Sequence, residues 1–191
     1  MPVVLHRNID TKTQIAIWKM SEPLEELLQS GVAIPENVKS NKRKKEWVCS
    51  RLLLKQLAPN SNISYNQYGA PTLSNGSAIS ISHSNDYCTI LISKKTAAID
   101  LEFISTKADR LKDQFITKEE AELVTKSEIS TLIWCAKECL FKIYQQGNLI
   151  FKKDLIIKNI EENSIKTSLK KTAYTLHFEK FKNHFLVYYF E

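Results

Sequence analysis

Three carboxylates stand in segments that otherwise have the pattern of buried structure. Asp100 and Glu102 lie two residues apart in an apolar run, so strand alternation points both acids toward the same face. Glu138 follows in an apolar, helix-like segment. Unit charges about 4 Å apart repel by about 4 kcal/mol at an effective dielectric near 20, so clustering these acids without a cation would be costly. Carboxylates together with water and a phosphate suit Mg²⁺, and we predict a magnesium site at Asp100, Glu102 and Glu138.

Lys142 lies one helical turn after Glu138 and shares its face. A surface ion pair is the simplest interpretation of this spacing. The segment also carries Trp134, Leu140 and Phe141, however, so the helix is apolar over much of its circumference and Glu138 is expected to be half-buried. Lys142 could accept a proton if desolvation and nearby positive charge lowered its pKa, whereas a carboxylate beside it would act in the opposite direction.

Two further segments could bind an anion. Ser82, His83 and Ser84 follow a strand-like run, and their hydroxyl and imidazole groups could donate to a phosphate or a base edge. Residues 39–45 are mostly basic, which fits a solvated helix face, a phosphate site or a docking site for an acidic protein.

Composition limits the class of protein. The 191 residues are 43% hydrophobic and 25% charged, with four Gly and five Pro, which is typical of a folded globular chain rather than a disordered one. The net charge of +6 favours an acidic partner. No apolar run is long enough for a membrane span or a signal peptide, so we expect a cytoplasmic protein without membrane contact.

Hydrophobic periodicity and turn signals predict an α+β fold with mostly antiparallel sheets. We expect helices near residues 21–31, 35–57, 108–115, 117–125 and 127–146, and strands near 3–5, 14–18, 78–82, 87–93, 96–103, 154–160, 173–179 and 184–190. The strands from 78 to 103 are expected to form a meander that ends on Asp100 and Glu102.

Five segments, in order along residues 42–142, together resemble one family. They are Glu46 to Leu54 with Arg51 before a Leu pair, Tyr68-Gly69-Ala70-Pro71, Ser82-His83-Ser84, Ala98-Ile99-Asp100-Leu101-Glu102, and Trp134 to Lys142 with the pattern Trp-x-x-Lys-Glu-x-x-x-Lys. In this order they resemble the signature blocks of 4′-phosphopantetheinyl transferases of the single-chain type that activates peptide synthetases. The resemblance implies two similar packed halves related by a pseudo-twofold axis, here residues 1–102 and 103–191, in a monomer.

The activity that this resemblance implies is transfer of the phosphopantetheine arm of coenzyme A to a serine of an apo carrier protein, with release of adenosine 3′,5′-bisphosphate. Mg²⁺ on Asp100, Glu102 and Glu138 would bind the pyrophosphate. The serine proton would go to Lys142 or to a water near Glu120, although Glu120 also fits the third position of a capping box begun by Thr117.

Coenzyme A binding is assigned by the same resemblance. Arg51 and His83 match positions that contact the 3′-phosphate and adenylate end, and Ser82 belongs to the same block as His83. Lys42 and Arg43 of the basic segment would add phosphate contacts. The partner would be an acidic acyl or peptidyl carrier protein, attracted by the positive surface.

Two departures from the family pattern affect these expectations. The turn that carries a lysine in the family has Ala70 here, which removes a charge-assisted hydrogen bond worth about 1.5 to 3 kcal/mol. The glycine before Ile-Asp is Ala98, which adds a methyl group. A catalytically impaired protein that binds coenzyme A or a partner is therefore the alternative to an active transferase.

A magnesium-dependent nuclease is the third hypothesis, because basic charge and an Asp-x-Glu pair superficially allow it. That site needs Glu-x-Lys on a neighbouring strand, whereas Glu138 and Lys142 have helical spacing. We therefore expect no nucleic acid partner.

Overall fold

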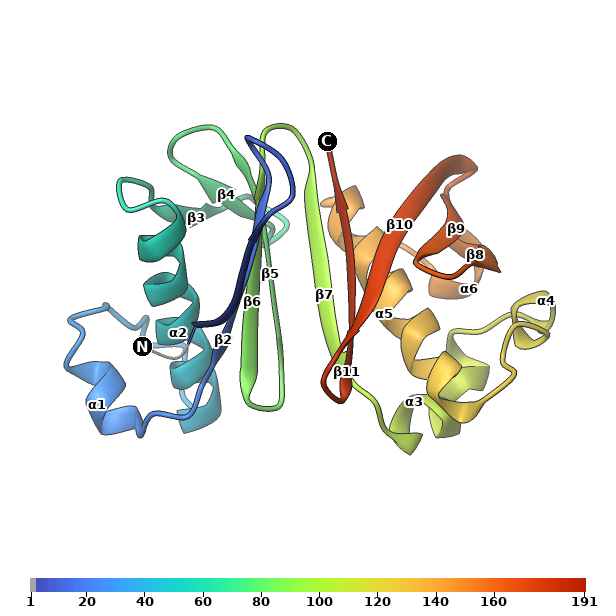
Figure 1. The fold of residues 1–191 in the computed structure, drawn as a ribbon, viewed down its shortest axis with the longest axis horizontal. Helices are drawn as coiled ribbons and strands as arrows, with labels where there is room; N and C mark the ends of the chain where they lie inside the picture. The colour runs from blue at the N-terminus through green and yellow to red at the C-terminus, as the bar shows by residue number, and fades with distance from the viewer. Residues whose placement is uncertain (1–2) are drawn as a thin grey trace.

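Two antiparallel sheets stand face to face, and each is covered on its outer side by one long helix (Figure 1). The computed structural model describes residues 3–191. The elements of the first half are β1 (Val3–Asn8), β2 (Gln14–Lys19), α1 (Leu24–Leu28), α2 (Asn41–Leu57), β3 (Ile63–Tyr65), β4 (Pro71–Leu73), β5 (Ala78–Ser84) and β6 (Tyr87–Ser93). Their main sheet has the order β1-β2-β6-β5, and β3 and β4 form a separate hairpin.

The second half begins with the strand that carries Asp100 and Glu102. Its elements are β7 (Ala97–Phe103), α3 (Thr106–Leu111), the 3₁₀ turn η1 (Lys112–Gln114), α4 (Lys118–Ala121), α5 (Ser127–Tyr144), α6 (Phe151–Asp154), β8 (Leu155–Ile160), β9 (Ser164–Leu169), β10 (Thr172–Phe181) and β11 (His184–Phe190). The sheet order is β7-β11-β10-β9-β8, and every pairing is antiparallel. The α+β expectation is confirmed.

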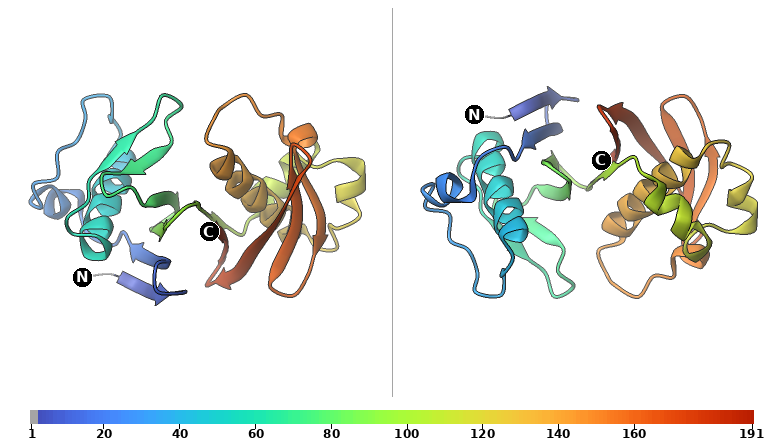
Figure 2. Two further views of the ribbon diagram at one scale, coloured as in Figure 1. Left: turned by 90° about the horizontal axis from the view of Figure 1, so that it is seen from above. Right: turned by 90° about the horizontal axis from the view of Figure 1, so that it is seen from below.

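Strand alternation divides the apolar side chains among three core layers. On β2, Ala16 and Trp18 face α2, while Ile15 and Ile17 face the second sheet. The layer between the sheets also contains Leu91 of β6 and Ala97, Ile99, Leu101 and Leu186 of the second sheet. The third layer lies between the second sheet and α5. Viewed along the sheets, the two halves form separate lobes that meet at β7 and β11 (Figure 2).

Side-chain hydroxyls of β5 join the two sheets. The backbone N–H groups of Ile99, Leu101 and Phe103 donate to Ser80 Oγ, Ser82 Oγ and Ser84 Oγ, at 3.0, 3.2 and 2.9 Å. These three serines, the serine ladder, satisfy the edge of β7 that does not pair with β11. Because the residues alternate on both strands, the ladder fixes the register of β7 against β5.

The expected meander from 78 to 103 was wrong in its last step. β5 pairs with β6, but β7 pairs with β11, the last strand of the chain. The turn after β6 carries β7 out of the first sheet. The side chains of Ile99 and Leu101 pack against the face of that sheet, so β7 does not extend its edge. Alternation predicts which face of a strand is buried, but it does not identify the strand's partner.

Several element boundaries also differ from expectation. Helix α2 begins at Asn41 rather than near residue 35, because Ser40 caps it by accepting a hydrogen bond from Arg43 N. Helix α5 ends at Tyr144, since Gln145 has a left-handed φ of 55°. The short strands β3, β4 and β9 were not predicted, and the expected helix at 108–115 is divided between α3 and η1.

The four cysteines of the chain are free and buried. Within residues 3–191, no helix is long and apolar enough to cross a membrane.

The serine ladder leads to a graded prediction. Ser80→Ala leaves the buried N–H of Ile99 without a partner and should lower the free energy of unfolding by about 1–3 kcal/mol. Ser84→Ala should have a smaller effect, because water can replace the hydroxyl at that exposed end. Urea unfolding of both variants measures the difference, and equal effects would contradict this account of the ladder.

Candidate active site between the two sheets

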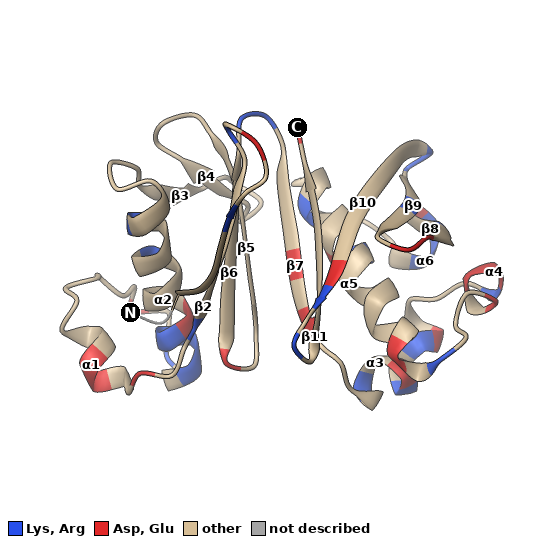
Figure 3. Ribbon diagram, viewed as in Figure 1, with Lys and Arg blue, Asp and Glu red and all other residues tan. Residues whose placement is uncertain are grey.

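The side chains of β7 alternate between the inter-sheet core and α5. Ile99 and Leu101 enter the core between the sheets. Ala98 packs in the α5 layer, and Asp100 and Glu102 contact side chains of the same helix. The two acids therefore share one face, as alternation predicts. Figure 3 shows the acidic positions of β7 in the middle of the molecule and Lys and Arg gathered on α2.

Asp100 is the most enclosed of the three acids, with 4% of its surface exposed. Ser82 Oγ donates to its Oδ1 at 2.8 Å, and Lys142 Nζ donates to the same oxygen at 2.7 Å. The other oxygen, Oδ2, is buried and has no hydrogen-bond partner. A buried carboxylate oxygen without a donor is costly, so Asp100 has one coordination position to offer.

Burial and the negative charge of Asp100 together raise the pKa values of Glu102 and Glu138. Burial, with added repulsion from Asp100 and Glu138, raises the pKa of Glu102 to about 7, although Trp134 Nε1 donates to Glu102 Oε1 at 3.1 Å. Burial and repulsion from Asp100 likewise raise the pKa of Glu138 to about 7. The three acids thus lie within one electrostatic neighbourhood, and a cation there would relieve their repulsion.

The expected metal site is not preassembled. Among residues 3–191, no group of three His, Cys, Asp or Glu side chains is arranged to hold an ion. The donor set nevertheless fits a hard divalent cation, because it consists of carboxylates and includes the unpartnered Oδ2 of Asp100.

Lys142 joins this cluster from α5. Its Nζ also donates to the carbonyl oxygen of Ile99 at 2.8 Å. Burial alone would lower the pKa of Lys142, but Asp100 and Glu138 outweigh it, so the pKa is raised. In the free protein Lys142 is therefore an ammonium donor rather than a base.

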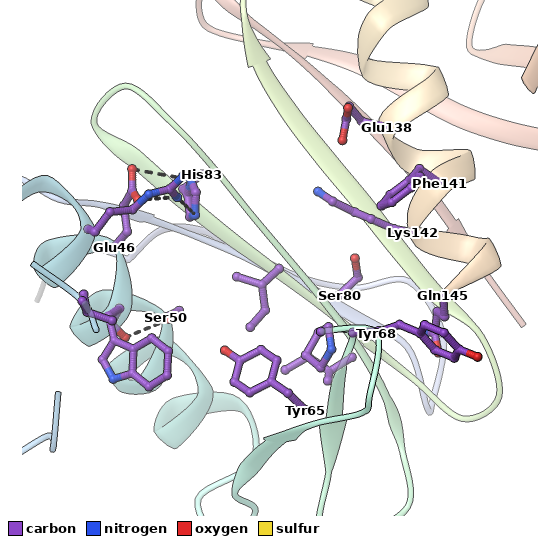
Figure 4. Close-up of a pocket in the computed structure, with 18 of the residues that line it drawn as sticks. Glu46, Ser50, Tyr65, Tyr68, Ser80, His83, Glu138, Phe141, Lys142 and Gln145 are labelled. Carbon is purple, nitrogen blue, oxygen red and sulfur yellow. Dashed lines mark hydrogen bonds and ion pairs between the residues drawn. The ribbon is translucent and has the colours of Figure 1, made fainter. Parts of the chain in front are cut away.

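A cavity of about 550 Å³ opens beside this cluster and has walls from both halves (Figure 4). The second half contributes Glu138, Phe141, Lys142 and residues 145–147. The first half contributes residues of α2, the β3–β4 hairpin and β5, namely Arg43, Glu46, Trp47, Ser50, Arg51, Tyr65, Tyr68, Gly69, Ala70, Pro71, Ile79, Ser80, Ile81 and His83, with residues 37–39 at the rim. An acidic and ammonium-bearing wall therefore faces a wall rich in guanidinium and aromatic groups.

Arg51 is held rigidly by neutral partners. Its guanidinium carbon lies 3.3 Å from the ring centroid of Trp47, and its Nη2 donates to Tyr65 Oη at 2.6 Å. Nη1 donates to Ser50 Oγ at 2.9 Å. Because these partners are uncharged, the positive charge of Arg51 stays available to an anion in the cavity.

Sequence reasoning missed Glu46, although the other residues predicted to bind phosphate, Lys42, Arg43 and His83, all surround its carboxylate. Its carboxylate is 4% exposed and accepts from Arg43 Nη1 at 3.0 Å, while Lys42 Nζ lies 3.9 Å and His83 Nδ1 3.5 Å from it. Spacings of three and four residues from Arg43 and Lys42 were the available signal. The contact with His83 joins α2 to the distant strand β5 and could not be predicted.

Three other predicted positions lie as follows. Ser82 is not among the residues that line the cavity, since its hydroxyl bonds Asp100 and Leu101 N. Ala70 lines the cavity at the position where the family pattern has a lysine. Ala98 is fully buried against α5, so its extra methyl group fills core rather than ligand space.

Glu120 is buried in the second half, with 1% of its surface exposed. Thr117 N, Ile157 N and Lys137 Nζ donate to its two oxygens at 2.8, 2.7 and 2.8 Å, and Thr117 and Glu120 form a capping box. The geometry favours the capping alternative over catalysis. Lys137, the residue before Glu138 in the motif, is fully buried and forms an ion pair with Glu120.

Glu102 lines a second cavity, of about 540 Å³. The walls of this cavity are largely apolar and include Leu111, Phe115, Trp134 and Phe151. The acidic cluster therefore has one cavity on the Glu138 side and another on the Glu102 side.

The second half is similar to one known family. Residues 97–189 match the 4′-phosphopantetheinyl transferase superfamily, from β7 almost to the end of β11. The matched segment contains Asp100, Glu102, Glu138 and Lys142. No curated protein matches the chain.

The role of Glu120 leads to a stability prediction. Glu120→Ala leaves Lys137 as an uncompensated buried charge and should lower the free energy of unfolding by about 3–5 kcal/mol. The neighbouring, exposed Glu119→Ala is the matched control and should change it by no more than about 0.5 kcal/mol. Chemical denaturation compares the two, and a Glu120→Ala protein as stable as the control would refute the structural role.

Proposed function

We propose that the protein transfers the 4′-phosphopantetheine arm of coenzyme A to a serine hydroxyl of an apo carrier protein and releases adenosine 3′,5′-bisphosphate. The observation that carries the proposal is the cavity in which Glu138 and Lys142 of the second half face Arg43, Arg51 and His83 of α2 and β5, with Asp100 bonded to Lys142 behind its wall. A ligand with phosphates at two places and an adenine suits such a cavity.

Coenzyme A would lie with its nucleotide end against the first half. Arg51, fixed on Trp47, would bind the 3′-phosphate, with Arg43 and His83 beside it. The pyrophosphate would then reach Lys142 and the acids of the second half. As coenzyme A first binds, the ammonium of Lys142, which Asp100 keeps protonated in the free protein, would donate to a phosphate oxygen.

Asp100, Glu102 and Glu138 would hold a divalent cation, for which we propose Mg²⁺. When bound, this ion would neutralise charge on the pyrophosphate. The buried, unpartnered Oδ2 of Asp100 supports the assignment from this chain's own residues.

In the reaction, the serine oxygen forms a bond to the phosphorus that carries the pantetheine arm, and the bond from that phosphorus to the bridging oxygen breaks. Adenosine 3′,5′-bisphosphate leaves with the bridging oxygen. Of the two bases considered, Lys142 lines the cavity, whereas both oxygens of Glu120 are already engaged. We assign proton acceptance to Lys142 as the neutral amine: a cation on Asp100 would weaken the ion pair that keeps Lys142 protonated in the free protein, and its proton would pass to solvent before the serine arrives.

The proposal also includes four details that the family resemblance implies. They are the single-chain subtype, an acidic carrier protein as partner, a monomer that works in the cytoplasm, and two halves that are related by a pseudo-twofold axis and divided near residue 102. A long helix on an antiparallel sheet in each half supports the pseudo-twofold relation. Because β7 pairs with β11, the strand before that division belongs to the second sheet.

One observation favours the alternative of an impaired protein that binds coenzyme A. Ala70 lines the cavity, so the lysine of the family pattern is missing from the place where a phosphate would bind. Binding of coenzyme A without any mass gain on several apo carriers would support this alternative.

Charge removal at the acids tests the proposal. Asp100→Asn and Glu138→Gln keep the side-chain shape and should each reduce transfer at least about 100-fold, because the charge stabilisation at the reacting phosphate is lost. Mass spectrometry of an apo carrier incubated with coenzyme A and Mg²⁺ measures the rate. Glu128→Gln, which lies in the same domain and pairs with Lys180, is the control and should be as active as the unmodified protein. Unchanged transfer by Asp100→Asn or Glu138→Gln would contradict the assignment.

Ala70→Lys tests the cationic wall. A lysine ammonium at this cavity position should tighten coenzyme A binding by about tenfold or more, which corresponds to a charge-assisted hydrogen bond of about 1.5–3 kcal/mol. Titration calorimetry measures the change. Ala70→Met, which adds a chain without charge, should give no such gain, and equal affinities for the two variants would exclude a phosphate at this position.

A further inference from the structure

We infer that Glu46 is an internal counter-anion that competes with phosphate ligands for Arg43 and His83, and thereby limits how tightly the cavity holds them. The inference concerns the cavity of the proposed function and rests on it only for the identity of the natural ligand. It assigns a specificity-determining role to a residue to which the family resemblance gave none.

The geometry of the free protein is a closed triangle of side chains. Arg43 Nη1 donates to Glu46 Oε2 at 3.0 Å and lies 3.2 Å from His83 Nε2. Since a guanidinium N–H can only donate, Nε2 accepts and the imidazole proton is on Nδ1, which faces Glu46 Oε1 at 3.5 Å. Arg43 and His83 are thus already bonded to each other and to an acid when the cavity holds no ligand (Figure 4).

The three side chains differ in their freedom to move. Glu46 is buried, with 4% of its side chain exposed, whereas the Arg43 side chain is 64% exposed and His83 33% exposed. The Glu46 carboxylate is therefore fixed at the floor of the cavity, whereas the side chains of Arg43 and His83 can turn toward the cavity. A phosphate bound there would have to draw Arg43 from Glu46 and would remain close to the buried negative charge.

Arg51 provides the contrast. Its partners, Trp47, Tyr65 and Ser50, are all neutral, so its charge attracts an anion without opposition. The wall thus combines one uncompensated guanidinium with one that is compensated by Glu46. Such a wall binds an anion but does not bind it as strongly as its number of cations suggests.

This balance has a consequence for turnover. Adenosine 3′,5′-bisphosphate keeps the 3′-phosphate that coenzyme A would place on this wall, so the same cations that capture the substrate also retain the product. The fixed charge of Glu46 weakens both interactions and favours release of the product.

The test is a binding measurement on Glu46→Gln. The amide keeps an oxygen that can accept from Arg43, so the wall stays ordered while its negative charge is removed. Titration calorimetry with adenosine 3′,5′-bisphosphate should show binding at least tenfold tighter than in the unmodified protein, equivalent to about 1.4 kcal/mol. Glu128→Gln makes the same change of net charge far from the cavity and should leave the affinity unchanged.

A second variant shows that the effect acts through the cation. In a protein that already carries Arg43→Met, Glu46→Gln should tighten binding by much less than tenfold relative to Arg43→Met alone. Equal or weaker binding by Glu46→Gln would overturn the inference, because Glu46 would then only position the cations. A gain that survives the loss of Arg43 would overturn it as well.

Failure of the proposed function is distinguishable from failure of this inference. A protein that transfers nothing to apo carriers, but whose Glu46→Gln variant binds the bisphosphate more tightly, contradicts the proposed activity and keeps the role of Glu46. A protein that transfers the arm but gains no affinity from Glu46→Gln contradicts only the inference.

Discussion

The hydrogen bonds from the backbone of β7 to Ser80, Ser82 and Ser84 are the constraint on which the site depends. They hold one strand between two sheets, with its apolar side chains in the inter-sheet core and its acids toward α5. A slip of one residue would exchange these faces and bury Leu101 where Asp100 now lies. Ser82 belongs both to the serine ladder and to the acidic site, since its hydroxyl accepts from Leu101 N and donates to Asp100. The same register of β7 against β5 therefore determines the packing of the sheets and the position of the acids.

The second determinant is a balance of charges across the cavity. On one side, burial and the charge of Asp100 raise the pKa values of Glu102 and Glu138, and Lys142 only partly offsets this effect. On the other side, Arg51 keeps an uncompensated charge while Arg43 is paired with Glu46. In the free protein, the acids thus favour binding of a cation, and the opposite wall favours binding of an anion. A magnesium-bound pyrophosphate nucleotide carries both charges and can bind at both places.

Sequence patterns predicted the features that depend on local periodicity. The shared face of Asp100 and Glu102, the apolar helix carrying Glu138 and Lys142, and the capping box at Glu120 all follow from spacing along one element. What could not be predicted depends on contacts between distant segments. The pairing of β7 with β11 joins strands from opposite ends of the second half, and the bond of His83 to Glu46 joins β5 to α2. The serines were interpreted as phosphate donors because their true partners, the N–H groups of β7, lie on another strand.

The central claim is that the acids of β7 and α5 share one divalent cation next to the pyrophosphate of coenzyme A. Anomalous scattering from a crystal grown with coenzyme A and Mn²⁺ in place of Mg²⁺ measures this directly. The account predicts one Mn²⁺ bound by Asp100 Oδ2, with Glu138 and Glu102 turned toward it and a pyrophosphate oxygen completing its coordination. A pyrophosphate bound in the cavity with no metal at Asp100, or a metal bound away from all three acids, would contradict it.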